Sequence, residues 1–216
     1  MGAAFAAVAS ALGRSGVRVA YTRKLFHFGV FSGAAVAHTL WGLPGTNAYG
    51  GAVALIVLGT VARADRSDFY EAIARDSDRP HRSLFIVVPL VTTAVGGLSS
   101  ALLTGPFAAV GYLVAGWGDA VAEPVGSRWG KHSYRVPSLR GVPAERTIEG
   151  SLAVFFVGGA AAAVGLWSLG VTGSALLIAA ATCAVVGTLV EAVSHHGTDN
   201  LTIQLAVSLT AAGLVG

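Results

Sequence analysis

The sequence has few of the residues that soluble domains use to face water. Only 12% of its 216 residues are charged, whereas about 25% is usual in a soluble domain. Hydrophobic residues make up 54% of the chain. This low charge, combined with repeated long apolar runs, indicates that lipid is the main solvent of the folded chain.

Cysteine is almost absent, because Cys183 is the single one and it lies inside an apolar run. One thiol excludes a disulfide framework within the chain, and no CxxC pair is present for a metal site. The sequence also has no P-loop (GxxxxGK[ST]), no kinase glycine-rich loop and no GxGxxG motif. Any nucleotide chemistry would therefore need a different scaffold.

Seven apolar runs predict an all-α, polytopic transmembrane helical bundle of about seven spans. Glycine is abundant, with 29 residues, and small residues favour close packing of helices in a membrane. We expect one membrane-embedded domain over residues 1–216. The runs cover approximately residues 26–43, 46–62, 83–103, 107–125, 150–169, 173–193 and 201–216.

Residues 1–22 precede the first run and form a separate case. The opening MGAAFAAVASAL is too short to span a bilayer and lacks the basic start of a signal peptide. We predict an N-terminal interfacial segment or a helix docked on the bundle. A short extra span is the alternative.

The connections between the runs alternate between uncharged and polar. Residues 43–45, 104–106 and 170–172 are short and uncharged, whereas residues 63–82, 126–149 and 194–200 are polar. If the polar connections share one side, all fourteen Lys and Arg residues fall there. The positive-inside rule then predicts a cytoplasmic N-terminus, cytoplasmic loops at 63–82 and 126–149, and an active site on the inner face of the cell membrane. Residues 63–82 resemble an amphipathic surface helix that ends near Pro80.

Two acidic residues lie inside the fourth apolar run. Asp119 and Glu123 are four positions apart, so both carboxylates lie on one helix face. Each acid near the centre of a bilayer costs about 2.5–3.5 kcal/mol, which favours a divalent-cation site or a general base facing a polar cavity. The alternative is that they pair with Arg128 or Lys131 at the membrane surface.

A second acidic group occurs where the sixth run ends. Glu191, His195 and Asp199 recur every four residues, and Asp199 and Asn200 open the last run. Helix capping alone would explain Asp199, but it explains neither Glu191 nor His195. For His195 we favour a phosphate contact or a proton relay over a zinc site.

The connection 126–149 is rich in cations and glycine. Gly126, Gly130 and Gly141 allow the backbone to curl round an anion, and Glu149 and Ser151 begin the fifth run, where a helix N-terminus favours anions. Membrane anchoring and affinity for anionic lipid are the alternative reason for this charge. With the buried acids, the pattern favours a nucleoside triphosphate with magnesium. The cations are Arg128, Lys131, Arg135, Arg140 and Arg146.

The first run begins YTRKLFHFGV and places Arg23, Lys24 and His27 where the chain enters lipid. Ordinary anchoring explains the two cations. His27 lies within the membrane boundary, and both packing and function remain open for it.

Three stretches together resemble a known family. RKLFHFG, GDAVAEPVGSRWGKHSYRVP…ERTIEGSLA and DNLTIQL, in that order, are similar to the CTP-dependent lipid-alcohol kinases, which include dolichol kinase, phytol kinase and CTP-dependent diacylglycerol kinase. The middle stretch is also similar to phosphatidate cytidylyltransferase. The absence of any Lys or Arg after Arg146 favours the kinases.

The resemblance implies transfer of the γ-phosphate of CTP to the hydroxyl of a membrane lipid alcohol, with a prenyl alcohol such as phytol or geranylgeraniol as first choice. It implies Mg²⁺ as cofactor and no nucleic acid partner. Cytidylyl transfer to phosphatidate or a prenyl phosphate is the second hypothesis, and a proton-coupled transporter is the non-enzymatic one. The motif residues that carry over are Arg23, Lys24, His27, Gly118, Asp119, Glu123, Gly126, Gly130, Lys131, Arg146, Glu149, Gly150, Ser151, Asp199 and Asn200.

We expect the following roles at the site. The catalytic residues are Asp119, Glu123 and His27, and either Glu123 or His27 takes the hydroxyl proton. The metal ligands are Asp119, Glu149 and Asp199. The nucleotide and its phosphates are bound by Arg23, Lys24, Gly126, Arg128, Gly130, Lys131, Arg135, Arg146, Gly150, Ser151, His195 and Asn200.

Overall fold

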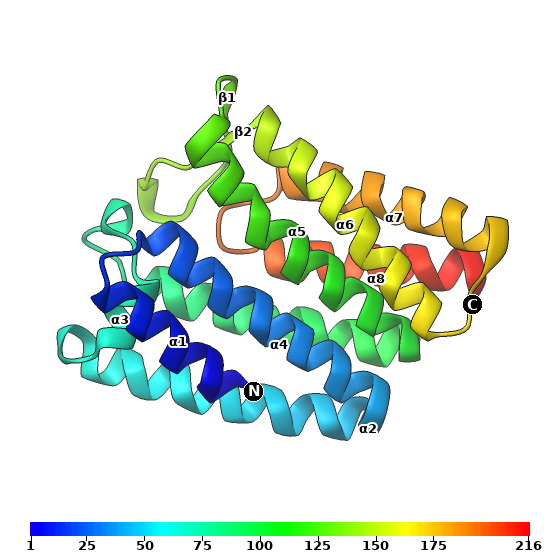
Figure 1. Ribbon diagram of the computed structural model, residues 1–216, viewed down its shortest axis with the longest axis horizontal. Coiled ribbons are helices and arrows are strands. Elements are labelled where there is room, and N and C mark those ends of the chain that lie inside the picture. Colours follow the sequence, from blue (N-terminus) through cyan, green and yellow to red (C-terminus); the bar gives the residue numbers. More distant parts are fainter.

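The computed structural model describes the backbone of residues 1–216 and the surroundings of every residue except Asp65 and Gly141. Long helices run side by side along one direction (Figure 1), and the predicted all-α class is confirmed. Apart from a small hairpin, the described chain folds as α1 Gly2–Arg14, α2 Val19–Arg63, α3 Asp68–Ile73, α4 Leu84–Thr104, α5 Ala108–Trp129, α6 Ile148–Ser168, α7 Gly173–Val193 and α8 Asp199–Val215.

Two long helical stretches fold back on themselves. In α2 the chain reverses at Gly42, which has φ +60°, just before Pro44. Between α4 and α5 it reverses at Gly105, which has φ +55°. Glycine accepts these left-handed angles without a steric penalty, and a proline two residues into a new helix replaces an amide that has no helical partner. The seven apolar runs thus become seven helical arms.

A buried histidine joins the two reversals. His38 lies in the first arm of α2, and its Nδ1 is 2.9 Å from Thr46 Oγ1 in the second arm. Its Nε2 is 2.9 Å from the carbonyl oxygen of Gly105. Both ring nitrogens are therefore used in structure, at the end of the bundle that carries the uncharged turns.

Four helical stretches are long and apolar enough to cross a membrane: 19–63, 84–129, 148–168 and 173–193, with the shorter apolar α8 beside them. Many large apolar side chains on these helices are exposed, including Leu55, Leu102, Phe156 and Leu177. Such a surface is typical of contact with lipid rather than water. The chain is an integral membrane protein.

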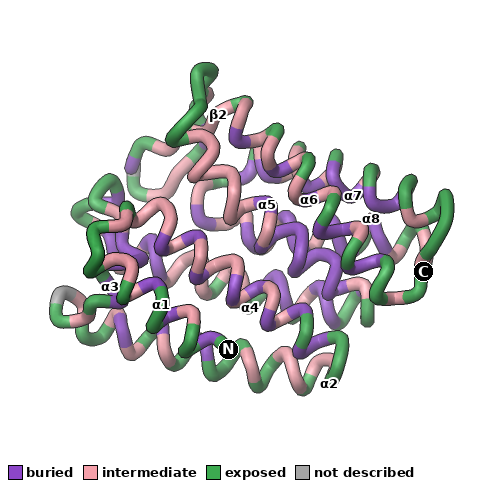
Figure 2. Tube along the Cα trace, viewed as in Figure 1, coloured by how far each residue is buried: buried purple, intermediate pink, exposed green. Residues whose placement is uncertain are grey.

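Helix α5 forms the centre of the bundle. Its first nine residues, 108–116, are all buried (Figure 2). Close approach depends on small residues: a Cβ on Gly116 would collide with Phe31 of α2, and one on Gly111 would collide with Ser208 and the backbone of α8. This packing holds α2 and α8 against α5, and Gly116 lies just before the polar residues of α5.

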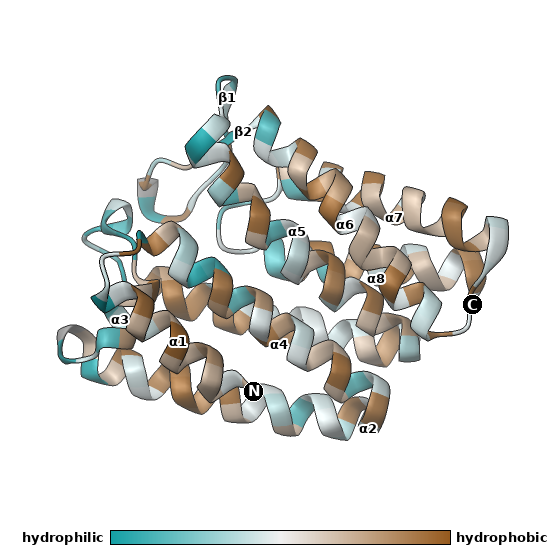
Figure 3. Ribbon diagram, in the orientation of Figure 1, coloured by the Kyte–Doolittle hydropathy of each residue, from teal (hydrophilic) through white to brown (hydrophobic). Residues whose placement is uncertain are grey.

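The polar connections gather at one end of the bundle (Figures 1 and 3). They comprise the segment after α2, the loop between α7 and α8, and a hairpin of strands β1 Ser133–Arg135 and β2 Glu145–Thr147. In this antiparallel hairpin, Tyr134 is opposite Arg146. The alternation predicted from the sequence is therefore present, while the cytoplasmic orientation of this end stays a prediction.

The connection 63–82 differs from the expected surface helix. The α-helix in it covers only Asp68–Ile73, and Ser67 caps it by accepting a hydrogen bond from the Tyr70 amide. The helix ends early because Ile73 and its apolar neighbours are buried against α1 and α2, while the charged residues after it bind one another. Helix α5 also extends beyond the expected end of the fourth apolar run, through Pro124 to Trp129. Helix α1 packs on α2 and α3 through buried alanines, which corresponds to the docked helix expected within residues 1–22.

Candidate active site

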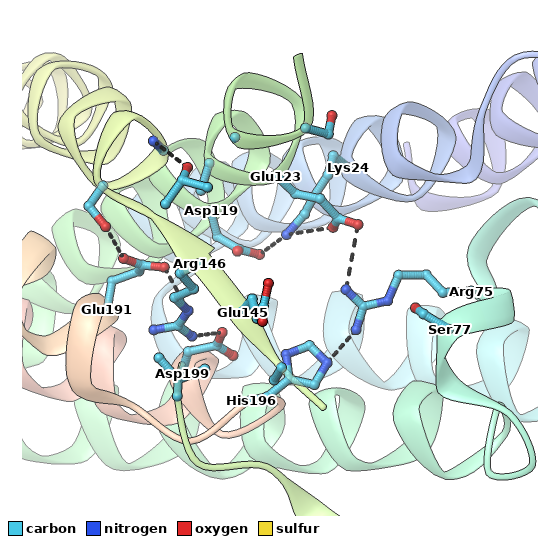
Figure 4. A pocket seen from close by; sticks show the side chains of 18 of the residues that line it. Lys24, Arg75, Ser77, Asp119, Glu123, Glu145, Arg146, Glu191, His196 and Asp199 are labelled. Carbon is cyan, nitrogen blue, oxygen red and sulfur yellow. Dashed lines mark hydrogen bonds and ion pairs between the residues drawn. The ribbon is translucent and has the colours of Figure 1, made fainter. Parts of the chain in front are cut away.

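A polar pocket of about 330 Å³ opens at the polar end of the bundle (Figure 4). It is lined from α2, the segment after α3, α5, the hairpin, α6, α7 and the loop before α8. Segments from the whole length of the chain thus converge on it. Its charged lining consists of four cations, Arg23, Lys24, Arg75 and Arg146, and six carboxylates, Asp78, Asp119, Glu123, Glu145, Glu191 and Asp199.

Asp119 is the centre of the first charge cluster in the pocket. Its Oδ2 lies 2.7 Å from Lys24 Nζ and 3.2 Å from His27 Nε2. Lys24 is also 3.6 Å from Glu123. Because both carboxylates lie on one face of α5, one lysine of α2 can bind both. Among the described residues, the alternative pairing of these acids with Arg128 or Lys131 is not found.

Arg146 is the centre of the second cluster. Its Nε forms an ion pair with Glu191 Oε1 at 3.0 Å, and its Nη2 donates to Asp199 at 2.9 Å. Ser151 donates to the other oxygen of Glu191 at 3.2 Å. The remaining nitrogen, Nη1, is buried and has no hydrogen-bond partner in the part of the chain that the structure describes. A buried guanidinium N–H that is free is an available donor for an anion.

A third group of contacts involves two residues that sequence reasoning missed, Arg75 and His196. Arg75 binds Asp78 at 3.1 Å and lies 3.5 Å from Glu123. It also contacts His196 Nε2, and the His196 ring stacks on Phe85 at 5.4 Å between centroids. Since a guanidinium only donates, His196 Nε2 must accept, so this imidazole is neutral with its proton on Nδ1.

An apolar cavity of about 110 Å³ meets the polar pocket. Four residues line both: Arg23, Asp119, His196 and Asp199. The rest of the apolar cavity is formed mainly by hydrophobic side chains of the two arms of α2, of α3 and of α4, namely Phe26, Val30, Phe31, Val53, Val57, Ile73, Phe85, Ile86, Pro89 and Leu90. The polar pocket and the apolar cavity thus share a boundary that includes Asp119 and Asp199.

A comparison with known proteins agrees with this arrangement of a polar pocket beside an apolar cavity. A phytol kinase from Synechocystis sp. is 33% identical over 196 residues, which are 88% of this chain and 77% of that protein. The chain belongs to the phytol kinase family. No protein-family model and no solved structure matches it.

The structure brings to the pocket only some of the cations that were predicted from the sequence to bind phosphates. Arg23, Lys24 and Arg146 line it. Arg128, Lys131 and Arg135 are exposed and are not among the lining residues. They lie at the end of α5 and in the hairpin, where no buried acid faces them.

Three other predicted residues also take different positions. His195 is exposed, and its neighbour His196 faces the pocket instead. Asn200 lines the apolar cavity, where its side-chain amide donates to Thr93 at 2.9 Å. Glu149 is 2.8 Å from His132 in the hairpin and is not among the pocket residues.

The glycines of the motif act chiefly in close packing. Gly126 and Gly150 line the pocket, but a Cβ on Gly126 would lie 2.7 Å from Thr147 Oγ1 and one on Gly150 would lie 2.9 Å from the Ala122 carbonyl. Gly130 would collide with its own helix end, and Gly118 packs on α6. These glycines let α5 and α6 touch, which fixes the position of Asp119 relative to the start of α6.

The donor set of the pocket fits magnesium only together with a ligand. No three described Asp, Glu, His or Cys residues form a group that would hold a metal ion by themselves. The expected trio of Asp119, Glu149 and Asp199 is not brought together, because Glu149 lies outside the pocket. Asp119 and Asp199 do line it, and Mg²⁺ is commonly held by one or two carboxylates plus substrate phosphates. The metal role of these two aspartates stays a prediction.

His196 gives the site a testable response to acid. Burial, and next the charge of Arg75, lowers the pKa of His196 from 6.5 to about 3. Above about pH 6.5 the imidazole is neutral in both folded and unfolded states. Between pH 6.5 and 3, His196 is protonated in the unfolded chain but not in the folded chain. The free energy of unfolding therefore decreases as the pH falls, by at most about 1.4 kcal/mol per pH unit.

We therefore expect His196→Gln to flatten the loss of thermal stability between pH 6.5 and 4.5 in detergent. The glutamine keeps an acceptor for Arg75 but does not titrate. His195→Gln is the control, because His195 is exposed. Equal pH profiles for His196→Gln and the wild type would contradict the prediction.

Proposed function

We propose that this protein transfers the γ-phosphate of a nucleoside triphosphate, with CTP as the first choice, to the hydroxyl of a membrane lipid alcohol. The proposed acceptor is a prenyl alcohol such as phytol or geranylgeraniol. The observation that carries the proposal is the junction of the polar pocket with the apolar cavity at Asp119 and Asp199. A reaction between a nucleoside triphosphate and a hydrophobic alcohol needs a polar site and an apolar site that adjoin each other.

The cations of the pocket support binding of the phosphates. Arg23 lines both cavities and makes no ion pair or hydrogen bond with any described side chain. Arg146 has a free buried N–H. Phosphoryl transfer depends chiefly on positioning and on neutralising charge at the transferred group. We assign that work to Arg23, Arg146 and Lys24, rather than to the exposed Lys131 and Arg135.

Charge balance supports a divalent cation. The lining has four cations and six carboxylates, so a triphosphate would meet an excess of negative charge. Mg²⁺ bound to the phosphates, next to Asp119 and Asp199, would offset that excess and would supply charge neutralisation during transfer. The carboxylates keep their places because Lys24 and Arg146 hold them.

The position of the two candidate bases favours His27. His27 lines the apolar cavity, whereas Glu123 lines the polar pocket and is engaged by Lys24 and Arg75. In the proposed step, the lipid oxygen bonds to the γ-phosphorus, the bond from that phosphorus to the β–γ bridging oxygen breaks, and the hydroxyl proton moves to His27 Nε2. Asp119, 3.2 Å from this nitrogen, would stabilise the resulting imidazolium.

Purified protein, phytol or geranylgeraniol in detergent micelles, Mg²⁺ and CTP labelled at either the α or the γ position test the proposal. A kinase moves γ-label to lipid and releases CDP. Incorporation of α-label with release of pyrophosphate would show cytidylyl transfer instead. Transfer from ATP but not CTP would overturn the nucleotide assignment alone, and uptake into vesicles without nucleotide would favour a transporter.

A matched pair of arginine variants tests which cations bind the phosphates. We expect Arg23→Gln to lower kcat/KM for CTP by roughly 100-fold or more, the scale of losing one preorganised charge partner in a phosphoryl- or acyl-transfer site. Arg128→Gln removes the same charge from an exposed position and should change it less than threefold. Equal losses in the two variants would mean that general surface charge, rather than Arg23, attracts the nucleotide.

A further inference from the structure

We infer that the apolar cavity binds the carbons next to the hydroxyl of one unesterified isoprenoid chain, and that the rest of the chain leaves between the second arm of α2 and α4. This inference rests on the proposed function and specifies its acceptor. Val53 and Val57 form the wall from α2, and Ile86 and Leu90 form the wall from α4. The two helices lie side by side in Figure 1.

The size of the cavity determines how much of the lipid it can enclose. Its volume of about 110 Å³ is well below the roughly 300–1,000 Å³ of pockets that enclose a whole small ligand. Only the head of a long chain therefore fits. The remaining carbons would lie against exposed apolar side chains such as Leu55 on the same arm of α2, where lipid already solvates the protein.

The polarity of the walls selects against a glycerolipid. Away from the junction, the polar side chains of this cavity are His27, Thr93 and Asn200. Asn200 already donates to Thr93, and His27 lies against Asp119. Away from the junction, the two ester carbonyls of a diacylglycerol would meet only the Thr93 hydroxyl and the second N–H of Asn200 as donors, in a cavity otherwise lined mainly by hydrocarbon. A buried polar group without a partner is unfavourable. A prenyl alcohol has only hydrocarbon at these positions.

The geometry at the junction places the hydroxyl. A chain whose tail contacts Phe26 and Phe85 meets Arg23, Asp119, His196 and Asp199 at its head, because these four residues line both cavities. The hydroxyl is the one polar group of the lipid, so it belongs at this boundary. His196 is fixed there from the other side by Arg75 and by stacking on Phe85.

Two adjacent positions on α2 provide a matched test. Val57 is buried in the cavity wall, with 4% exposure, whereas Leu58 is 46% exposed on the outer face. We expect Val57→Phe to raise KM for geranylgeraniol at least tenfold while KM for CTP changes less than twofold. Leu58→Phe should change neither constant more than twofold. The same KM for geranylgeraniol in both variants would overturn the inference.

Direct labelling separates this inference from the proposed function. A photoreactive geranylgeraniol analogue with its diazirine close to the hydroxyl is irradiated with the protein in the absence of nucleotide, and the modified peptides are identified by mass spectrometry. Labels within 53–57 or 86–90, reduced by excess geranylgeraniol but not by diacylglycerol, support the cavity even if no nucleotide supports transfer. Labels confined to α6 and α7, with phosphorylated product formed normally, would contradict the assignment of the lipid to this cavity but not the proposed kinase activity.

A cavity-enlarging variant covers the case in which Val57→Phe does not fold. Ile86→Ala removes side-chain volume from the wall that α4 provides, so it widens the cavity and cannot overpack it. We expect the preference for geranylgeraniol over a prenyl alcohol with a bulkier substituent near the hydroxyl to fall at least fivefold in this variant. An unchanged preference in a folded Ile86→Ala protein counts against the inference.

Discussion

Asp119→Asn is expected to reduce turnover by at least roughly 1,000-fold, the upper range for removing one preorganised electrostatic group from an active site. Asp119 lies at the boundary between the two cavities, and its Oδ2 is 2.7 Å from Lys24 Nζ and 3.2 Å from His27 Nε2. Asparagine removes the charge that would face a metal-bound triphosphate, and it also removes the partner of a protonated His27. Both effects act on the chemical step, so kcat should fall more than KM changes.

The variant should still fold, which makes its loss of activity interpretable. Asparagine has nearly the same size and keeps an oxygen acceptor for Lys24, and Glu123 remains 3.6 Å from the same ammonium group. Thermal unfolding in detergent measures this directly. Asp68→Asn is the control, because Asp68 is 61% exposed and pairs only with Arg14 in the described structure. Normal turnover in folded Asp119→Asn would remove both the metal role and the support of His27.

The spans and the polar end of the bundle could be predicted because they depend on one-dimensional patterns. Each apolar run became a helical arm, and the alternation of uncharged and polar connections predicted that the charges gather at one end. The spacing of four between Asp119 and Glu123 also determined their shared face. These features need no knowledge of which helices are neighbours.

The residues that the sequence missed depend on contacts between distant segments. Arg75 lies in a connection with alternating charges, which is typical of a solvated surface, yet it reaches Glu123 on α5, 48 positions later. The sequence offers two adjacent histidines and no means of choosing between them. The structure selects His196, because its ring packs on Phe85 while His195 is exposed.

The opposite error concerns the hairpin. Its cations suggested a loop that encloses phosphate, but a two-stranded hairpin alternates its side chains between two faces. In this register Arg146 reaches the two acids at the ends of α7 and α8, whereas Arg135 is 92% exposed and pairs only loosely with Glu145, at 3.9 Å. The number of cations in this connection therefore did not predict which of them lines the pocket. The register of the two strands determines that Arg146 does so.

Arg146→Met is expected to have the largest effect on stability, with a loss of roughly 3–5 kcal/mol of unfolding free energy, because it leaves two buried carboxylates without their cation. The side chain of Glu191 is 4% exposed and that of Asp199 is 14% exposed. For a chain of this length, the loss corresponds to a fall in melting temperature of roughly 10 °C. Arg146→Lys should recover only part of it, since an ammonium group lacks the planar fork that reaches both acids.

A triple variant separates the structural role of Arg146 from its role at the phosphates. Arg146→Met combined with Glu191→Gln and Asp199→Asn removes the whole buried charge cluster, so most of the lost melting temperature should return, because the unpaired charges that caused the loss are gone. Turnover should nevertheless stay at least roughly 100-fold below wild type, because the polar pocket lacks the free guanidinium N–H and the junction lacks the Asp199 carboxylate. Recovery of turnover together with stability would mean that this cluster only holds α7, α8 and the hairpin together, and the phosphates would then have to be bound by the Arg23 and Lys24 side alone.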